Sequence, residues 1–220
     1  MSVLTERHVT PSILASDFAQ LAAKTREIMD AGARVIHCDV MDGHFVPPMT
    51  FGPMVVAALR ESLPDEAYLD VHLMIERPER QVAEFAKAGA DGITIQVEAT
   101  PNIAFALAAI RDAGCNAGLV VSPGTPPAHF GENEIDLALL MTVNPGWGGQ
   151  PFMSNQLDKI KRVRAMLGDA TPIEVDGGIN PKTAAQCAEA GATWCVAGSA
   201  IFGADDPAAA YREIAAAAGC

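Results

Sequence analysis

Histidine and aspartate side chains lie at the ends of apolar, strand-like segments in three places along the chain. His37 and Asp39 are two residues apart, so alternation along a strand points both side chains to the same side. His72 occupies a second such segment, and Asp176 precedes a pair of glycines in a third. Two imidazoles and two carboxylates suit a divalent cation, so this pattern predicts a metal site. For each residue alone, a hydrogen-bonded core histidine or a turn aspartate is the ordinary alternative.

Glycine-rich loops follow the last three strand-like segments, at 143–152, 176–178 and 197–202. Glycine lets the backbone approach a ligand closely, and free N–H groups at the start of a helix bind phosphate. In the last loop, Gly198 and Ser199 are placed to supply such groups. The loops therefore predict binding of a phosphorylated substrate, although each loop alone could be an ordinary tight turn.

Acid and base catalysis beside a metal is the chemistry that these residues favour. The lysines fall in helix-like segments or at their starts rather than at strand ends, which argues against a Schiff-base aldolase. No Gly-x-Ser-x-Gly motif is present, and Cys38 should point away from the axis that His37 and Asp39 face. Asp39 and Asp176 could approach a substrate from opposite faces, one removing a proton and the other returning one, which inverts a stereocentre. A divalent cation would stabilise the enediolate between them.

Composition limits the partners and the location. The chain has 220 residues, of which 50% are hydrophobic, and a formal net charge of −12. That charge argues against a nucleic-acid partner, while a small anionic substrate is compatible with it if backbone N–H groups and a metal supply positive potential. Five cysteines without a Cys-x-x-Cys pair suggest a reducing compartment. No signal-peptide core and no segment of bilayer length is present, so we expect a cytoplasmic protein without a membrane partner.

Alternating strand-like and helix-like stretches must position these residues. Strand candidates lie at 9–14, 35–41, 68–75, 92–98, 116–122, 137–143, 172–178 and 194–198. Amphipathic helix candidates lie between them, including 18–32, 78–89, 103–114, 157–167 and 182–191. This alternation predicts an α/β fold, a (β/α)8 TIM barrel in a single domain over 1–220, with chemistry at the carboxyl ends of the strands. An open doubly wound sheet is the alternative, but its Gly-x-Gly-x-x-Gly motif is absent.

Ordered motifs along essentially the whole chain resemble the ribulose-phosphate 3-epimerase family. They are Pro11-Ser-Ile-Leu14, His37-Cys-Asp-Val-Met-Asp-Gly-His-Phe-Val-Pro47, Asp70-Val-His-Leu-Met74, Met141-Thr-Val-Asn-Pro-Gly146, Gly148-Gly-Gln150, Glu174-Val-Asp-Gly-Gly-Ile179 and Ala197-Gly-Ser-Ala-Ile-Phe202. The resemblance implies interconversion of D-ribulose 5-phosphate and D-xylulose 5-phosphate in the pentose phosphate pathway, and in the Calvin cycle where one exists. It also implies a TIM barrel and a homo-oligomer, either a dimer or a hexamer.

The resemblance further implies roles for individual residues. His37, Asp39, His72 and Asp176 would bind the divalent cation, with Asp39 as proton acceptor and Asp176 as proton donor in one direction. The cation could be Zn²⁺, Fe²⁺, Mn²⁺ or Co²⁺, and no organic cofactor is expected. An apolar wall, for which core filling is the ordinary alternative, would come from Met41, Met74 and Met141. The substrate-binding residues would be Ser12, His72, Gly146, Trp147, Gly148, Gly149, Asp176, Gly177, Gly178, Gly198 and Ser199.

A few positions depart from the family pattern. Gln96 stands where histidine is usual, Trp147 where phenylalanine is usual, and Pro48 where asparagine is usual. Gln96 keeps a neutral hydrogen-bonding group, so we expect these changes to tune substrate preference rather than remove the metal or the acid/base pair. The inverted order Ala15-Ser16 should affect only a helix cap at Ser16.

Two other functions stay open from the sequence. The nearer is an epimerase of a longer ketose phosphate such as D-allulose 6-phosphate, although Asp176-Gly-Gly and Val143-Asn-Pro-Gly fit the pentose enzymes better. The other is a phosphate-binding barrel that has lost catalysis and serves as a sensor or scaffold, which the two carboxylates and two histidines disfavour. In the loop after the first ligand pair, Asp42 is expected to form a turn, and the role of His44 is left open.

Overall fold

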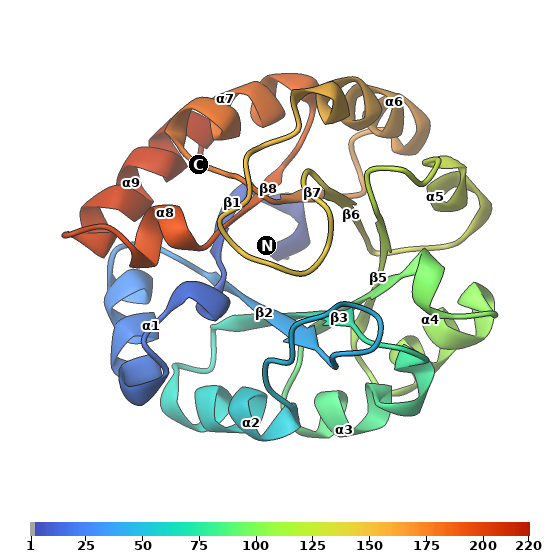
Figure 1. Cartoon of the computed structure of the whole chain (residues 1–220), viewed down its shortest axis with the longest axis horizontal. Coiled ribbons are helices and arrows are strands. Elements are labelled where there is room, and N and C mark those ends of the chain that lie inside the picture. The colour runs from blue at the N-terminus through green and yellow to red at the C-terminus, as the bar shows by residue number, and fades with distance from the viewer. Residues whose placement is uncertain (1–2) are drawn as a thin grey trace.

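The structure, a computed structural model, describes residues 3–220 and consists of parallel strands surrounded by helices (Figure 1). The strands are β1 (His8–Pro11), β2 (Val35–Met41), β3 (Tyr68–Met74), β4 (Gly92–Gln96), β5 (Asn116–Val121), β6 (Leu137–Met141), β7 (Ile173–Asp176) and β8 (Trp194–Ala197). The α-helices are α1 (Leu21–Asp30), α2 (Pro53–Ser62), α3 (Val82–Lys87), α4 (Ile103–Asp112), α5 (Ala128–Glu132), α6 (Leu157–Leu167), α7 (Pro181–Ala190), α8 (Ser199–Phe202) and α9 (Pro207–Ala218). None of the helices within residues 3–220 has the length and apolarity that crossing a bilayer requires.

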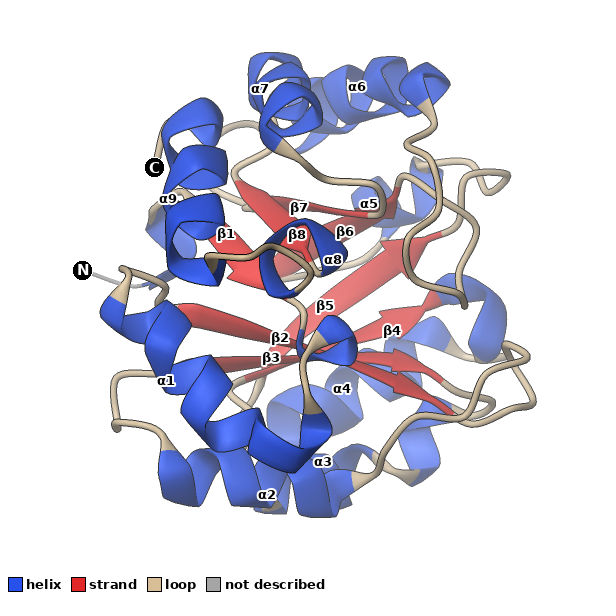
Figure 2. Ribbon diagram, turned by 60° about the vertical axis from the view of Figure 1, so that its left-hand side comes forward, coloured by secondary structure: helices blue, strands red, loops and turns tan. Residues whose placement is uncertain are grey.

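The strands pair side by side into one curved sheet in the order β1-β8-β7-β6-β5-β4-β3-β2. A parallel bridge between Ser12 and His37 links the end of β1 to β2, so the sheet nearly closes on itself. Figures 1 and 2 show the strands at the centre of the molecule and the helices around them. This arrangement confirms the predicted (β/α)8 TIM barrel and excludes the open doubly wound sheet.

Local sequence signals set the ends of the helices, as α7 illustrates. The Asn180 side chain accepts hydrogen bonds from the amides of Lys182 and Thr183, at 3.0 Å and 3.1 Å. The Thr183 hydroxyl accepts in return from the Asn180 amide at 2.9 Å, which completes a capping box. The helix ends at Gly191, whose φ of 110° lies in the left-handed region that favours glycine.

Two predicted strands, 9–14 and 92–98, are shorter in the structure because each passes into a 3₁₀ turn at its carboxyl end. After β1, the Ser12 hydroxyl accepts a hydrogen bond from the Leu14 amide at 3.3 Å and begins such a turn. The helix cap predicted at Ser16 is wrong. The Asp17 carboxylate caps the next turn instead, because its oxygen accepts from the Ala19 amide at 2.9 Å while Ser16 ends the preceding turn.

Outward-facing strand residues pack against the helices and form the main hydrophobic core. On β2 these are Ile36, Cys38 and Val40, which are buried and belong to the same core as residues of α2. Cys38 therefore points away from the barrel axis, as predicted, because side chains alternate along a strand. The remaining cysteines are also free thiols, buried except for the last: Cys115, Cys187, Cys195 and Cys220.

Inward-facing residues form layers along the barrel axis. The lower layer is apolar, has Val3 and Leu4 packed against it, and consists of Val35, Tyr68, Leu137 and Trp194. The middle layer is polar and fully buried, and consists of Thr10, His37, Asp70 and Glu174. The upper layer, at the carboxyl ends of the strands, consists of Ser12, Asp39, His72, Gln96 and Asp176. Polar side chains thus collect at the end of the barrel where a TIM barrel carries its chemistry.

Candidate active site and metal centre

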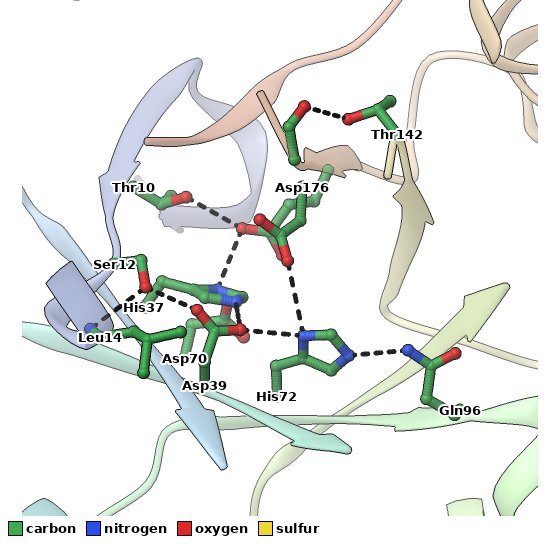
Figure 3. A network of polar contacts seen from close by, with 12 residues as sticks. Thr10, Ser12, Leu14, His37, Asp39, Asp70, His72, Gln96, Thr142 and Asp176 are labelled. Atoms are coloured by element: carbon green, nitrogen blue, oxygen red, sulfur yellow. Dashed lines mark hydrogen bonds and ion pairs between the residues drawn. The ribbon is translucent and has the colours of Figure 1, made fainter. Parts of the chain in front are cut away.

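Side chains from three strands converge at the carboxyl end of the barrel (Figure 3). His37 and Asp39 come from β2, His72 from β3 and Asp176 from the last position of β7. Each side chain offers one ligand atom, and these atoms all lie within 4.8 Å of one another. The structure therefore brings together the residues that the sequence predicts as metal ligands.

The spacing of these atoms suits a divalent cation. Asp39 Oδ1 lies 3.2 Å from His37 Nε2 and 3.3 Å from His72 Nδ1. Asp176 Oδ2 lies 3.8 Å from the same His72 nitrogen. Ligand atoms about 2.1 Å from a tetrahedral cation are about 3.4 Å apart, so small side-chain movements would bring these atoms to bonding distance of one ion. A mixed set of nitrogen and oxygen donors suits Zn²⁺, Fe²⁺, Mn²⁺ or Co²⁺.

Asp70, in the middle layer, orients His37. Its Oδ2 lies 2.6 Å from His37 Nδ1, and both side chains are fully buried. A proton on Nδ1 donates to that carboxylate, so Nε2 is the ring nitrogen that faces Asp39. Glu174 Oε1 lies 3.5 Å from His37 Nδ1 and accepts a hydrogen bond from the Thr10 hydroxyl at 3.0 Å. The middle layer therefore supports this ligand from below.

His72 faces the site through Nδ1, whereas His37 does so through Nε2. The Nδ1 of His72 faces the two aspartates, while its Nε2 lies 3.1 Å from the amide nitrogen of Gln96 on β4. Gln96 is fully buried, and its Oε1 accepts a hydrogen bond from the Ser122 hydroxyl at 3.4 Å. The Ser12 hydroxyl donates to Asp39 Oδ2 at 2.5 Å. Both histidines and Asp39 are thus held by a neighbouring side chain.

The two aspartates have opposite pKa shifts. Burial alone would raise the pKa of Asp39, but the charge and hydrogen bond of His37, together with His72, hold it well below its usual range. Burial, and then the negative charge of Asp39, raises the pKa of Asp176 to about 7. Carboxyl groups whose surroundings push their pKa values apart are typical of acid/base pairs.

The two histidines also differ in their pKa. Burial disfavours a charged imidazole, yet Asp39, Asp70 and Glu174 outweigh burial and raise the pKa of His37 well above its ordinary value of 6.5. At His72, burial prevails over the contact with Asp39, so its pKa is lowered. His72 is therefore ready to act as a neutral ligand, whereas His37 must release a proton when a cation binds.

A cavity of about 900 Å³ opens above these groups, with Asp39 and Asp176 among the residues that line it. The three methionines predicted to form an apolar wall are buried and lie in this lining: Met41, Met74 and Met141. Within residues 3–220, the lining contains no lysine or arginine. An anionic ligand would therefore be met by backbone N–H groups and by a cation rather than by basic side chains.

Glycine-rich loops form the rim of the cavity, and two of the glycines are required by close packing. Gly177 and Gly178 have φ values of 124° and 68°. A Cβ atom at Gly177 would lie 2.5 Å from Val143 Cγ2, and one at Gly178 would lie 2.6 Å from the Phe152 amide nitrogen. The loop after β7 therefore packs directly against the loop after β6, which curves in gold in front of the barrel centre in Figure 1.

The cavity collects nearly all the residues that the sequence predicts to bind substrate. In the lining are Ser12, Gly146, Trp147, Gly148, Gly149, Asp176, Gly177, Gly178, Gly198 and Ser199. The exception is His72, which is fully buried beneath the cavity floor. Of the departures from the family pattern, Pro48 and Trp147 line the cavity, whereas Gln96 lies behind His72.

The loop after β2 places Asp42 and His44 outside the ligand cluster. Asp42 Oδ1 accepts hydrogen bonds from the amides of His44 and Phe45 at 2.8 Å and 2.9 Å, which confirms its predicted role in a turn. The His44 side chain is exposed, and its Nδ1 lies 3.1 Å from the carbonyl of Asp42. His44 is thus a loop residue.

Asp70 and Glu174 support the site, yet neither is predicted from the sequence as a functional residue. Each lies two positions before a ligand on the same strand, Asp70 before His72 and Glu174 before Asp176. Because side chains alternate along a strand, this spacing places all of them inside the barrel. That spacing is the signal that could have found the middle layer.

Known proteins are similar to this chain over nearly its whole length. The sequence profile of the ribulose-phosphate 3 epimerase family matches residues 8–202. The ribulose-phosphate 3-epimerase of Bacillus subtilis is 47% identical over 214 residues, which cover 94% of this chain and 97% of the relative. The protein of the same name in Escherichia coli is 44% identical, over 94% of this chain and 92% of its own length. The chloroplastic ribulose-5-phosphate-3-epimerase of Arabidopsis thaliana is 46% identical, over 94% of this chain and 75% of its own length.

Solved structures share the fold at lower sequence identity. KGPDC from Streptococcus mutans has a TM-score of 0.74 at 19% identity, over 97% of this chain and 98% of its own. The 3-hexulose-6-phosphate synthase from Salmonella typhimurium has a TM-score of 0.73 at 17% identity, over 96% of this chain and 98% of its own. These likenesses show the barrel fold alone. The profile match and the closer relatives show more, namely that the chain belongs to the ribulose-phosphate 3-epimerase family.

Proposed function

We propose that this protein is a divalent-cation-dependent epimerase that interconverts D-ribulose 5-phosphate and D-xylulose 5-phosphate at C3, as part of pentose phosphate metabolism. The observation that carries the proposal is the gathering of two histidine nitrogens and two carboxylate oxygens within 4.8 Å beneath a glycine-rimmed cavity. Family membership supports the choice of substrate and reaction.

The upper layer and His37 together would hold the cation. The ligand atoms would be His37 Nε2, His72 Nδ1 and one oxygen each from Asp39 and Asp176. Their mutual distances and their mixed nitrogen and oxygen chemistry fit such an ion. When bound, the cation supplies Lewis-acid stabilisation of the negative charge that develops on the substrate oxygens. The charges of the two carboxylates balance the charge of a divalent ion.

Asp39 and Asp176 would move the protons at C3 of the sugar. Asp39 lines the cavity, and the Ser12 hydroxyl holds its carboxylate in place, so it can accept the C3 proton and leave an enediolate. Asp176, at the end of β7, also lines the cavity, and its carboxyl group would deliver a proton to the other face of C3. Removal from one face and return to the other inverts the configuration, and the two roles exchange in the reverse reaction.

The surrounding residues would orient the sugar and shield the intermediate. The Ser12 hydroxyl fixes Asp39 by donating to its Oδ2 at 2.5 Å. The apolar wall of Met41, Met74 and Met141 would exclude water from one side of the enediolate. Backbone N–H groups at Gly198 and Ser199, where α8 begins, would bind the phosphate.

Deuterium incorporation tests the proposal. Protein loaded with Zn²⁺, Fe²⁺, Mn²⁺ or Co²⁺ is incubated with D-ribulose 5-phosphate in heavy water, and the product is examined by NMR and mass spectrometry. We expect D-xylulose 5-phosphate with deuterium at C3, because a carboxyl proton exchanges with solvent before it is returned. Chelator-treated protein is the control and should be inactive.

The outcomes separate the proposal from its rivals. Absence of D-xylulose 5-phosphate with every cation would contradict the proposed reaction, and unlabelled product would contradict proton transfer through exchangeable carboxyl groups. D-allulose 6-phosphate is assayed in parallel. A higher kcat/KM for that hexose phosphate would assign the protein to the longer ketose phosphates.

A further inference from the structure

We propose that Gln96 is a positioning residue: by accepting a hydrogen bond from Nε2–H of His72, it stabilises the tautomer that offers Nδ1 to a divalent cation. The inference rests on the proposed cation site and concerns how one ligand is prepared for it. Gln96 touches neither the cavity nor the carboxylates, and the residue acts only through the far nitrogen of His72.

The orientation of the His72 ring means that only one of its two neutral tautomers can bind the cation. Its Nδ1 faces Asp39 at 3.3 Å and Asp176 at 3.8 Å, so Nδ1 is the atom that a cation between these groups would meet. A neutral imidazole binds a cation through the nitrogen that has no proton. His72 must therefore carry its proton on Nε2, and that proton needs an acceptor because the ring is fully buried.

Gln96 is the side chain at that position. Its amide nitrogen lies 3.1 Å from His72 Nε2, an arrangement in which the amide donates and the proton of His72 sits on Nδ1. Rotating the amide by half a turn about its last side-chain bond exchanges the oxygen and the nitrogen with little other movement. The oxygen then accepts from Nε2–H, and Nδ1 is free for the cation.

Ser122 makes both amide orientations possible. Its hydroxyl lies 3.4 Å from Gln96 Oε1 at the other end of the amide. A hydroxyl donates to the amide oxygen in one orientation and accepts from the amide nitrogen in the other. The buried amide therefore has a partner at each end in either state, and cation binding selects the state in which Gln96 accepts.

Substitutions that keep or remove the acceptor test this role. The Gln96→Leu substitution removes the acceptor. In Gln96→Glu, an ionised carboxylate can accept a hydrogen bond from His72 but cannot donate one. Thr94→Val is the matched control, because Thr94 is fully buried on the same strand two residues before Gln96. Apparent Zn²⁺ affinity is measured for each folded variant by competition with a chromophoric chelator at fixed pH, after circular dichroism has confirmed native secondary structure.

We expect Gln96→Leu to bind Zn²⁺ about 10- to 100-fold more weakly than the native protein. Gln96→Glu should bind at least as tightly as the native protein, and Thr94→Val should match it. An affinity of Gln96→Leu equal to that of the native protein would overturn the inference, and so would Gln96→Glu binding as weakly as Gln96→Leu.

A spectroscopic readout on the native protein keeps the inference testable even if the variants fold poorly. The ¹⁵N NMR shifts of His72 in Zn²⁺-loaded protein report which ring nitrogen carries the proton. A protonated Nε2 supports the role of Gln96, and a protonated Nδ1 overturns it.

Native protein that binds no divalent cation would contradict the proposed cation dependence as well. Tight native binding that is indifferent to Gln96 would overturn only this inference.

Discussion

The two ends of the barrel interior differ sharply although the same strands build both. β2 and β3 contribute Val35 and Tyr68 to the lower layer, and Asp39 and His72 to the upper layer. The lower layer is closed by apolar contacts with the N-terminal segment, whereas the upper layer meets the cavity. One end of each strand therefore stabilises the fold, and the other end supplies groups for chemistry.

Contacts within the lower layer fit a purely structural role. The Trp194 ring meets the rings of His8 and Tyr68 edge to face, with centroids 5.4 Å and 5.7 Å away. Its indole N–H donates to the carbonyl of Glu6 at 3.2 Å, so the buried polar group has a partner. By contrast, the two carboxylates and the His72 imidazole of the upper layer lie, together with His37 just below, at distances that suit an added cation. If this division is correct, changes at the two ends should have separable effects.

The largest effect is expected from Asp176→Asn in the upper layer. Asparagine keeps the shape of the side chain but cannot return a proton, so we expect kcat to fall by about 10²- to 10⁴-fold. Steady-state kinetics at saturating cation measures the loss, and thermal unfolding should show that the fold is intact. A kcat within about tenfold of the native value would remove Asp176 from the acid/base pair.

Leu137→Ala in the lower layer should damage stability and leave chemistry alone. Leu137 is 2% exposed, and truncation of such a side chain lowers the free energy of unfolding by about 2–5 kcal/mol. Urea unfolding measures this change, and kcat is compared at a temperature where the variant is fully folded. A large drop in kcat under those conditions would break the comparison, because the lower layer would then also control the geometry of the site.

Cation removal should destabilise the protein through the upper layer. A ligand that binds only the native state at about 100 times its Kd adds about 2.7 kcal/mol to the free energy of unfolding. We expect chelation to lower Tm by a similar increment in the native protein and in Leu137→Ala, since distant sites contribute additively. If chelation lowered the Tm of Leu137→Ala by a clearly different amount than that of the native protein, the two ends of the barrel would be energetically coupled.

The smallest effect is the pH dependence of cation affinity. The pKa of Asp176, about 7, and the raised pKa of His37 mean that both groups hold protons at mildly acidic pH and must release them to bind a cation. Apparent affinity should therefore rise with pH below 7, by about tenfold, or about 1.4 kcal/mol, per pH unit for each proton released. Chelator competition at several pH values measures the slope. A flat profile from about pH 6 to about pH 7 would contradict the assignment of Asp176 as a ligand.

The barrel could be predicted from the sequence because strand-like and helix-like stretches alternate along the chain, and the ligand cluster because its residues stand near the carboxyl ends of strands that meet at one end of a barrel. Within the cluster, His37 and Asp39 could be placed together, since residues two positions apart on one strand share one face. The strand ends were harder to predict, because β1 and β4 pass into 3₁₀ turns whose onset depends on local hydrogen bonds such as the one that Ser12 accepts.

Contacts between strands could not be predicted in the same way. The pairing of Gln96 with His72 depends on the register of β3 against β4, in which His72 stands opposite Thr94. The contact of Asp70 with His37 likewise depends on the register of β2 and β3. The sequence of one strand alone does not specify its register against the neighbouring strand. The expected homo-oligomer and the cytoplasmic location stay predictions.

The tight packing around Gly177 and Gly178 bears on how distant descendants of this barrel should be interpreted. Any larger residue at either position would collide with Val143 or with the backbone of Phe152, whatever the protein does. A descendant that kept Val143 and the backbone path at Phe152 would therefore need this glycine pair even if it had abandoned catalysis. The glycine pair therefore reflects a packing requirement of the fold, whereas the histidines and aspartates are the residues that bear on the chemistry.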